Sequence, residues 1–137
     1  MNAALTPTER ELEILKILWD RGEASVRDVY EQMRQTTPIV QNTVQAFLRT
    51  MEEKGLVRHR LEGRTFIYRT ACRSQQTRQH LAEQLLQRAF DGAIDQLVQS
   101  VLDVRKPTVS ELARLEELIA QAKAAKGKGS KRKEAAP

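Results

Sequence analysis

The sequence predicts a mainly α-helical fold with one small β-hairpin. Three observations predict it. Apolar residues recur at helical spacing from residue 12 to residue 51, residues 57–69 read as two short strands around a turn, and helical spacing returns from residue 81 onward. The order helix, helix, helix, hairpin is that of a winged helix-turn-helix followed by a helical region. Winged helices commonly bind DNA, so we expect a DNA-binding protein.

The first two helices are marked by their start signals. Thr6-Pro7-Thr8-Glu9 has the pattern of a capping box with Pro at the first helical position. An apolar stripe follows and ends near Gly22; its members are Leu12, Leu15, Leu18 and Trp19. Ser25-Val26-Arg27-Asp28 repeats a cap-like signal before a short second helix, which Thr36-Thr37-Pro38 breaks.

A third helix is predicted over residues 40–54. Its apolar residues recur at helical period and should form the packed face: Val40, Val44, Phe47, Leu48 and Met51. Gly55 follows directly, as expected of a residue that ends a helix with positive φ. Polar residues occupy the other face, which is therefore free to meet a partner.

The hairpin follows that glycine. Val57, His59 and Leu61 alternate with two arginines, Glu62-Gly63 supplies a turn, and residues 65–68 are strand formers. These residues form the predicted wing, so that the winged domain covers residues 5–71.

Residues 72–122 carry only helical patterns. The apolar residues from 81 to 102 fit either one long helix or two short helices interrupted at Asp91-Gly92, and Thr108-Val109-Ser110-Glu111 caps a further helix. The apolar positions expected to form an interface are Leu81, Leu85, Phe90, Ile94, Leu97, Val98, Val101, Leu102, Leu115 and Leu118. These stripes lack an obvious partner in so small a chain, so we expect a homodimer. Packing back onto the winged domain is the alternative.

The positive charge is concentrated at the end of the chain. The net charge is +5 and the isoelectric point about 9.7. Residues 1–70 hold 11 basic and 10 acidic residues, residues 71–122 hold 6 and 7, and residues 123–137 hold 6 and 1. We expect this tail to be disordered, either lying along DNA or only solubilising the chain. Within residues 42–69 a local patch of 6 basic against 3 acidic residues remains, and it is the relevant signal for DNA binding.

Other classes of protein are disfavoured. No apolar run approaches the roughly 18 residues needed to span a bilayer, no signal segment is seen, and Cys72 is the only cysteine, so we expect a cytoplasmic protein. Cys72, His59 and His80 lack metal-ligand spacing. No nucleophile set or phosphate-binding loop is present either, so we expect neither an enzyme nor a cofactor.

Residues 5–122 resemble the penicillinase-repressor family, the BlaI/MecI/CopY group of bacterial regulators. The most specific matching segments are Leu18-Trp19, Thr43-Val44 and the stretch from Lys54-Gly55 to Tyr68. The resemblance implies a dimeric repressor with an N-terminal winged helix and a C-terminal dimerisation region. In well-known members a membrane sensor peptidase relieves repression by cutting the dimerisation helix; copper-sensing members carry a C-terminal cysteine cluster.

Two departures from the family pattern leave the inducing signal open. The cleaved Asn-Phe bond of the penicillinase repressors corresponds to Ser100-Val101 here, and a single cysteine cannot supply the copper cluster.

The resemblance also places the DNA contacts. They fall on Asn42, Thr43, Gln45, Ala46 and Arg49, and Gln41 shares their polar face. Asn42 and Gln45 stand where related repressors have basic residues, and amides pair with adenine whereas Arg favours guanine. Arg60 and Arg64 flank the wing turn and should contact phosphates or the minor groove. A two-fold dimer predicts a pseudo-palindromic operator. An architectural DNA binder indifferent to sequence and a protein-interaction module are the alternatives.

Overall fold

The structure is a computed structural model that describes residues 6–135, with side chains described for residues 6–127. The chain divides into two compact units, Met1–Ala89 and Phe90–Pro137. The division falls at the end of helix α4 (Ser74–Phe90). None of the helices in this described part is long and apolar enough to cross a membrane.

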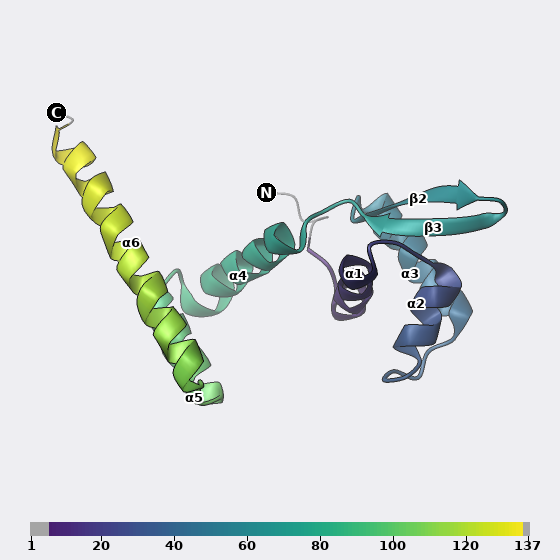
Figure 1. The fold of residues 1–137 in the computed structure, drawn as a ribbon, viewed down its shortest axis with the longest axis horizontal. Coiled ribbons are helices and arrows are strands. Elements are labelled where there is room, and N and C mark those ends of the chain that lie inside the picture. The colour runs from purple at the N-terminus through teal and green to yellow at the C-terminus, as the bar shows by residue number, and fades with distance from the viewer. Residues whose placement is uncertain (1–5, 136–137) are drawn as a thin grey trace. The chain divides into compact units, whose positions relative to one another are not determined.

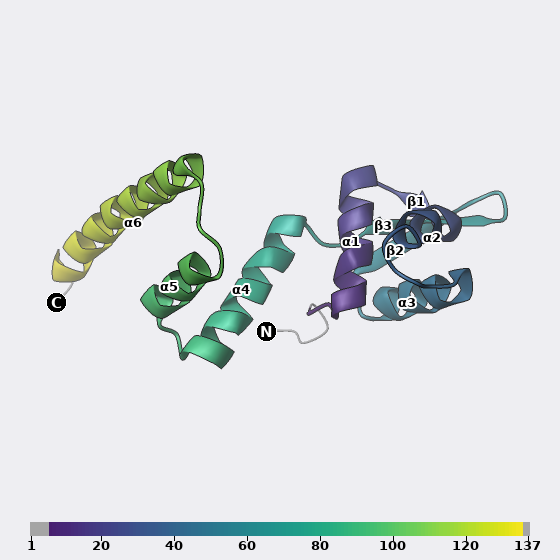
Figure 2. The same ribbon diagram turned by 90° about the horizontal axis from the view of Figure 1, so that it is seen from below.

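The first unit is a winged helix-turn-helix, as predicted (Figures 1 and 2). Its elements are α1 (Glu9–Arg21), β1 (Ala24–Ser25), α2 (Val26–Met33), α3 (Gln41–Glu53), β2 (Val57–Glu62), β3 (Thr65–Thr70) and most of α4. The sheet is antiparallel with the order β1-β3-β2, in which Ala24 pairs with Tyr68 and Ser25 with Ile67. The sequence did not reveal β1, because two residues are too few to show an alternating pattern.

The start of α1 lies two residues later than predicted. Thr8, not Thr6, is the N-cap: its hydroxyl accepts from the Glu11 N–H at 3.3 Å, and the Thr8 N–H donates to Glu11 Oε1 at 2.9 Å. Both registers satisfy the local capping pattern. The later one also brings the Glu11 carboxylate within 2.8 Å of Lys54 Nζ, a tertiary contact that the local sequence does not show.

A single hydrophobic core supports the three helices and the base of the hairpin. Its fully buried members include Ile14, Leu15, Leu18, Val29, Val44, Leu48, Met51, Leu56 and Val57. Val40 was predicted to join them, but it is 62% exposed. It is the N-cap of α3 and lies outside the helical repeat, so the helical spacing does not apply to it.

The hairpin leaves the core and extends into solvent (Figure 1). Val57 and Tyr68 are buried at its base. Glu62 pairs with Thr65, so the turn residues are Gly63 and Arg64, one position later than predicted. Gly63 has φ +65°, and a hairpin with a two-residue turn needs positive φ at this position.

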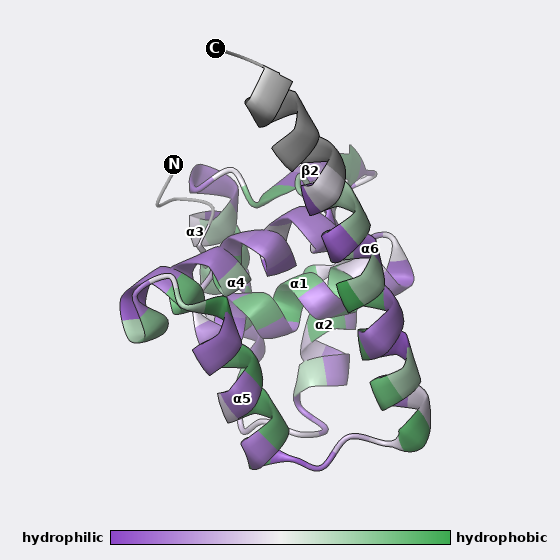
Figure 3. Cartoon of the chain, turned by 90° about the vertical axis from the view of Figure 1, so that its left-hand side faces the viewer, coloured by the Kyte–Doolittle hydropathy of each residue, from purple (hydrophilic) through white to green (hydrophobic). Residues whose placement is uncertain are grey.

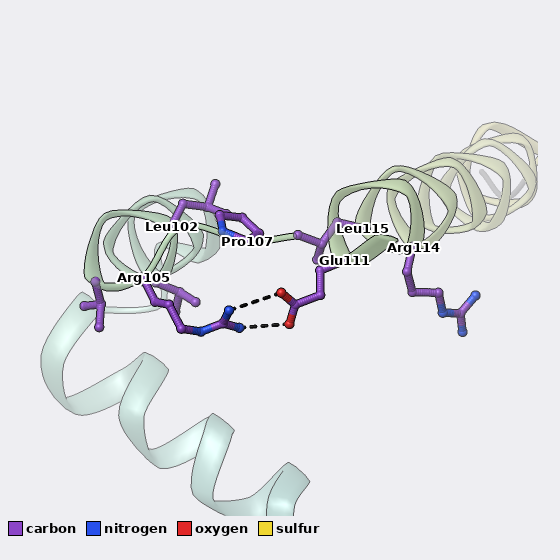
Figure 4. A pocket seen from close by; sticks show the side chains of 8 residues that line it. Leu102, Arg105, Pro107, Glu111, Arg114 and Leu115 are labelled. Atoms are coloured by element: carbon purple, nitrogen blue, oxygen red, sulfur yellow. Dashed lines mark hydrogen bonds and ion pairs between the residues drawn. The ribbon is translucent and has the colours of Figure 1, made fainter. Parts of the chain in front are cut away.

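The second unit contains α5 (Ile94–Val104) and α6 (Val109–Ala135). The sequence allowed one long helix or two short ones, and the structure has two: at the break before α5, Asp91 has φ 48° and Gly92 has φ 84°. Thr108 and Glu111 form the predicted capping box at the start of α6. An apolar hollow lies between α5 and α6, and Arg105 binds Glu111 beside it at 2.8 Å (Figure 4). No residue of α5 is buried, although Figure 3 shows hydrophobic positions along this helix.

The tail was predicted to be disordered, and the structure corrects this for its backbone. Helix α6 continues without interruption through residues 123–135. Ala and Lys are strong helix formers, and lengthening an existing helix does not require a new nucleus. The last two residues of the predicted tail lie outside the described range.

Candidate nucleic-acid interface

Helix α3 is fixed in rotation by its apolar residues. Val44, Leu48 and Met51 are completely buried and follow one another at helical spacing. The opposite side of the helix must therefore face solvent. Every residue of α3 that the sequence assigned to DNA is exposed: Gln41, Asn42, Thr43, Gln45, Ala46 and Arg49.

Two hollows border the exposed side of α3. The first lies toward the wing and is lined by Ser25 of β1, by Val26 and Arg27 at the start of α2, by Gln41 and Gln45 of α3, and by Arg64, Thr65 and Phe66 at the wing turn and the start of β3. The second lies toward α1, where Thr43 and Ala46 meet Thr8 and Glu11. The structure thus gathers Gln41, Gln45 and Arg64 on one flank of α3 and places Thr43 and Ala46 on the other.

Arg27 and Phe66 border the first hollow, and the sequence did not identify either as a site residue. Arg27 is a first-turn helical arginine whose side chain is 75% exposed, with only a 3.9 Å ion pair to Glu31. Phe66 looked like an ordinary strand residue. Nothing local distinguishes either of them, because the hollow exists only when α2, α3 and the wing have come together.

The two wing arginines have different surroundings. Arg60 Nη2 lies 2.6 Å from Glu23 and Nη1 lies 3.2 Å from Glu62. The Glu23 carboxylate raises the pKa of Arg60, and Arg60 lowers the pKa of Glu23 in return. Arg64 has no ion pair with any residue in the range 6–127. The charge at the turn is therefore available to a ligand, whereas that of Arg60 is already compensated.

The wing is attached to α3 by a histidine. His59 Nδ1 lies 2.7 Å from Glu52 Oε1 near the end of α3, and the His59 ring stacks on Phe66 with a centroid distance of 4.3 Å. At the same end of α3, Lys54 pairs with the buried Glu11 of α1. These contacts hold α3 between α1 and the wing.

Within residues 6–127, no group of three His, Cys, Asp or Glu side chains is placed to hold a metal ion. His59 contacts Glu52, and His80 lies 2.7 Å from the hydroxyl of Thr6. The interface therefore consists of amides, hydroxyls, arginines and one exposed aromatic ring. Such groups can pair with base edges and phosphates.

Comparison with known proteins gives consistent matches. A family model described as penicillinase repressor matches residues 7–121. The penicillinase repressor of Bacillus licheniformis is 23% identical over 116 residues, covering 85% of this chain and 91% of that protein. Two solution structures are similar, each with 26% identity. The DNA-binding domain of the repressor BlaI covers 54% of this chain and 90% of its own, with a TM-score of 0.48. Monomeric Bacillus licheniformis BlaI in complex with the blaP half-operator covers 51% and 85%, with a TM-score of 0.46.

Proposed function

Because the chain belongs to the penicillinase repressor family, whose members are DNA-binding transcription regulators and not enzymes, we propose that it represses by binding a pseudo-palindromic operator as a homodimer. Helix α3 enters the major groove and the wing turn lies on the adjacent backbone. The observation that carries this proposal is the hollow in which Gln41 and Gln45 of α3 meet Arg64 of the wing. A repressor acts where the bacterial chromosome lies, so we place it in the cytoplasm.

The chemistry of α3 favours adenine. Asn42 and Gln45 have exposed side-chain amides. Such an amide can donate to N7 of adenine and accept from its exocyclic amine, which gives one bidentate pair. Arg49 lies further along the same exposed side and reaches a base or a phosphate. Arg64, without an ion pair in the range 6–127, contacts a phosphate and positions the wing without specifying a base.

The homodimer is supported by the unpartnered face of the second unit. On α5, Ile94 is 64% exposed, Val101 57% and Val98 41%. On α6, Leu118 is 42% exposed, and Leu115 lines the apolar hollow. Monomeric proteins rarely leave such a continuous apolar stripe in water. A second copy related by a two-fold axis would cover it and present two winged units to two half-sites.

The base-reading role is tested with Gln45→Ala. We expect this change to weaken binding to the operator by about 1–3 kcal/mol and to relax preference at one base pair of each half-site, with little loss on random DNA. Quantitative gel shifts with the chain's own promoter region and unrelated competitor DNA measure both effects. Gln79→Ala on the exposed side of α4 is the matched control and should leave both affinities unchanged. Equal losses on the two DNAs would rule out base reading by Gln45.

We propose that a membrane sensor peptidase releases the protein from its operator by cutting the chain. The family's cleaved bond corresponds to Ser100-Val101, which lies within α5 (Ile94–Val104). A helical bond must unwind locally before a peptidase can cut it. Mass spectrometry of the protein from induced cells should show a cut between Asp91 and Asp103. If the chain were intact under full derepression, cleavage would not be the cause of release. A ligand or loss of synthesis of the protein would then explain it.

A further inference from the structure

One face of the wing carries apolar side chains out into solvent. The strand register places His59 opposite Tyr68 and Leu61 opposite Phe66, so these four side chains share a face. The inner pair is covered in part, since Tyr68 is only 3% exposed. The outer pair is not: Phe66 is 41% exposed and Leu61 62%. The buried core includes Tyr68 and not Phe66, so the fold alone does not account for an aromatic ring at this position.

The Phe66 ring is held in a defined position. It stacks on His59 with an interplanar angle of 22° and meets Tyr68 edge-on at a centroid distance of 6.4 Å. His59 is fixed in turn by Glu52 of α3. The ring is therefore oriented relative to α3 before any ligand arrives, and a preorganised side chain loses little conformational freedom on binding.

The ring borders the same hollow as the polar groups of the interface. Gln41 and Gln45 lie across from it on α3, and Arg27 and Arg64 lie beside it. Two arginines next to an exposed ring favour a polyanion over an apolar protein as the occupant. Continuity with the α3 surface then indicates which groove of the DNA the ring meets, because a helix such as α3, which carries Gln45, fits into the major groove and not into the narrower minor groove.

We propose that Phe66 is a specificity-determining residue, which makes apolar contact with the C5-methyl group of a thymine beside the base pair read by Gln45. Thymine is the only DNA base with a methyl group in the major groove, and apolar side chains, Phe among them, recognise it. Leu61, opposite Phe66 on the same face, shields the contact from water. The proposal rests on the proposed function, and it makes the wing a reader of sequence in addition to a clamp on the backbone.

Parallel selection tests the base preference. Full-length wild type, Phe66→Ala and Phe66→Leu each select from a pool of random-sequence duplexes. We expect a thymine preferred by the wild type in each half-site to be lost with Phe66→Ala and largely kept with Phe66→Leu, which retains an apolar side chain. Preferences at the other positions should not change. If Phe66→Ala selects the wild-type sequence, the proposal is wrong.

A single-methyl substitution then tests the contact itself. In the best wild-type duplex, each thymine is replaced in turn by deoxyuridine, which lacks only the methyl group. At one position per half-site the wild type should lose about threefold to fivefold in affinity, the loss expected for one buried methyl group. Phe66→Ala should show no further loss at that position. Arg64→Ala is the control. It should lower the affinity for every one of these duplexes by the same factor relative to wild type, and its loss on removal of the methyl group should equal that of wild type.

The remaining outcomes also decide the matter. If deoxyuridine lowered the affinity of wild type and of Phe66→Ala by the same factor, the proposed contact would be overturned. If Phe66→Ala does not fold, the wild type alone gives the test: the contact would be overturned if no deoxyuridine replacement changed its affinity. If Phe66→Ala changed the sedimentation mass but not the base preference, the exposed face of the wing would instead serve contacts between copies of this chain. If the wild type selects no sequence at all, the proposed operator-specific function fails, whatever the role of Phe66.

Discussion

Glu11 is a charged residue that the fold buries and keeps ionised. Burial of its carboxyl group tends to raise the pKa, but the Lys54 ammonium and the Thr8 N–H outweigh this and hold it below its ordinary value of 4.5. Because the pKa is lower in the folded state, the unfolded state binds more protons in acid. The stabilisation is therefore fully present above the unfolded value and is lost as pH falls through the folded value.

Glu11→Gln should lower the free energy of unfolding at pH 7 by about 1–3 kcal/mol, because Lys54 and the α1 cap lose a charged acceptor. It should also make the free energy of unfolding less dependent on pH below about 5. Urea denaturation from pH 7 to pH 2 measures both. The control is Glu13→Gln, which removes the exposed pair with Arg10 and should cost under about 1 kcal/mol. Equal costs for the two variants would show that burial of the pair has no effect.

At the scale of single residues, the sequence could predict what depends on local spacing. It predicted the exposed side of α3 because Val44, Leu48 and Met51 repeat at helical period. It could not predict that Arg60 is bound by Glu23, since 37 positions separate the two residues and the ion pair depends on the folded sheet. The DNA roles assigned to these exposed residues stay predictions.

The wing is the element in which charge should control affinity. Glu23→Gln releases Arg60 from its strongest partner, so we expect tighter binding to random DNA. The plot of log affinity against log salt should steepen by up to about 0.9, the value for one added phosphate contact. Arg64→Gln should make the same plot shallower by about 0.9. Titrations from low to physiological salt measure both slopes.

Glu83→Gln on α4 provides the control for the wing, because it changes the net charge by the same amount at a distance from the turn. It should leave the salt slope unchanged. If it steepened the slope as much as Glu23→Gln does, the effect would come from overall charge and not from release of Arg60.

At the scale of elements, start and stop signals were informative where they act locally. The capping residues of α2 and α6 and the glycine after α3 were predicted, and the break before α5 was one of the two alternatives that the sequence allowed. Strand β1 was missed because it exists only through pairing with β3. The extent of α6 was missed because composition suggested disorder, whereas the residues from 123 onward extend a helix that is already formed.

At the scale of the molecule, the first unit includes most of α4, because the start of this helix packs onto the rest of the unit. Thr77 is 3% exposed, and the Thr6 hydroxyl lies 2.7 Å from His80 Nε2 and accepts from Gln84 at 3.0 Å. Trp19 adds a hydrogen bond to the carbonyl of Cys72 at 3.0 Å. Most of α4 therefore belongs to the winged unit, and these contacts could not be predicted from the sequence because their partners lie far apart along the chain.

The second unit should decide how strongly the whole molecule holds its operator. Leu97→Asp places a charge on the apolar side of α5, where a dimer would remove it from water, so we expect monomers. Affinity for the full operator should fall severely, because each half-site would be bound alone, while affinity for an isolated half-site should stay the same. Sedimentation and titration of both DNAs measure this, with Gln99→Asp on the exposed polar side of α5 as the control. If Leu97→Asp remained a dimer, the interface would be intact and dimerisation through α5 would be contradicted. If affinity fell equally for the half-site and the full operator, the substitution would have damaged the winged unit itself, which would also contradict dimerisation through α5.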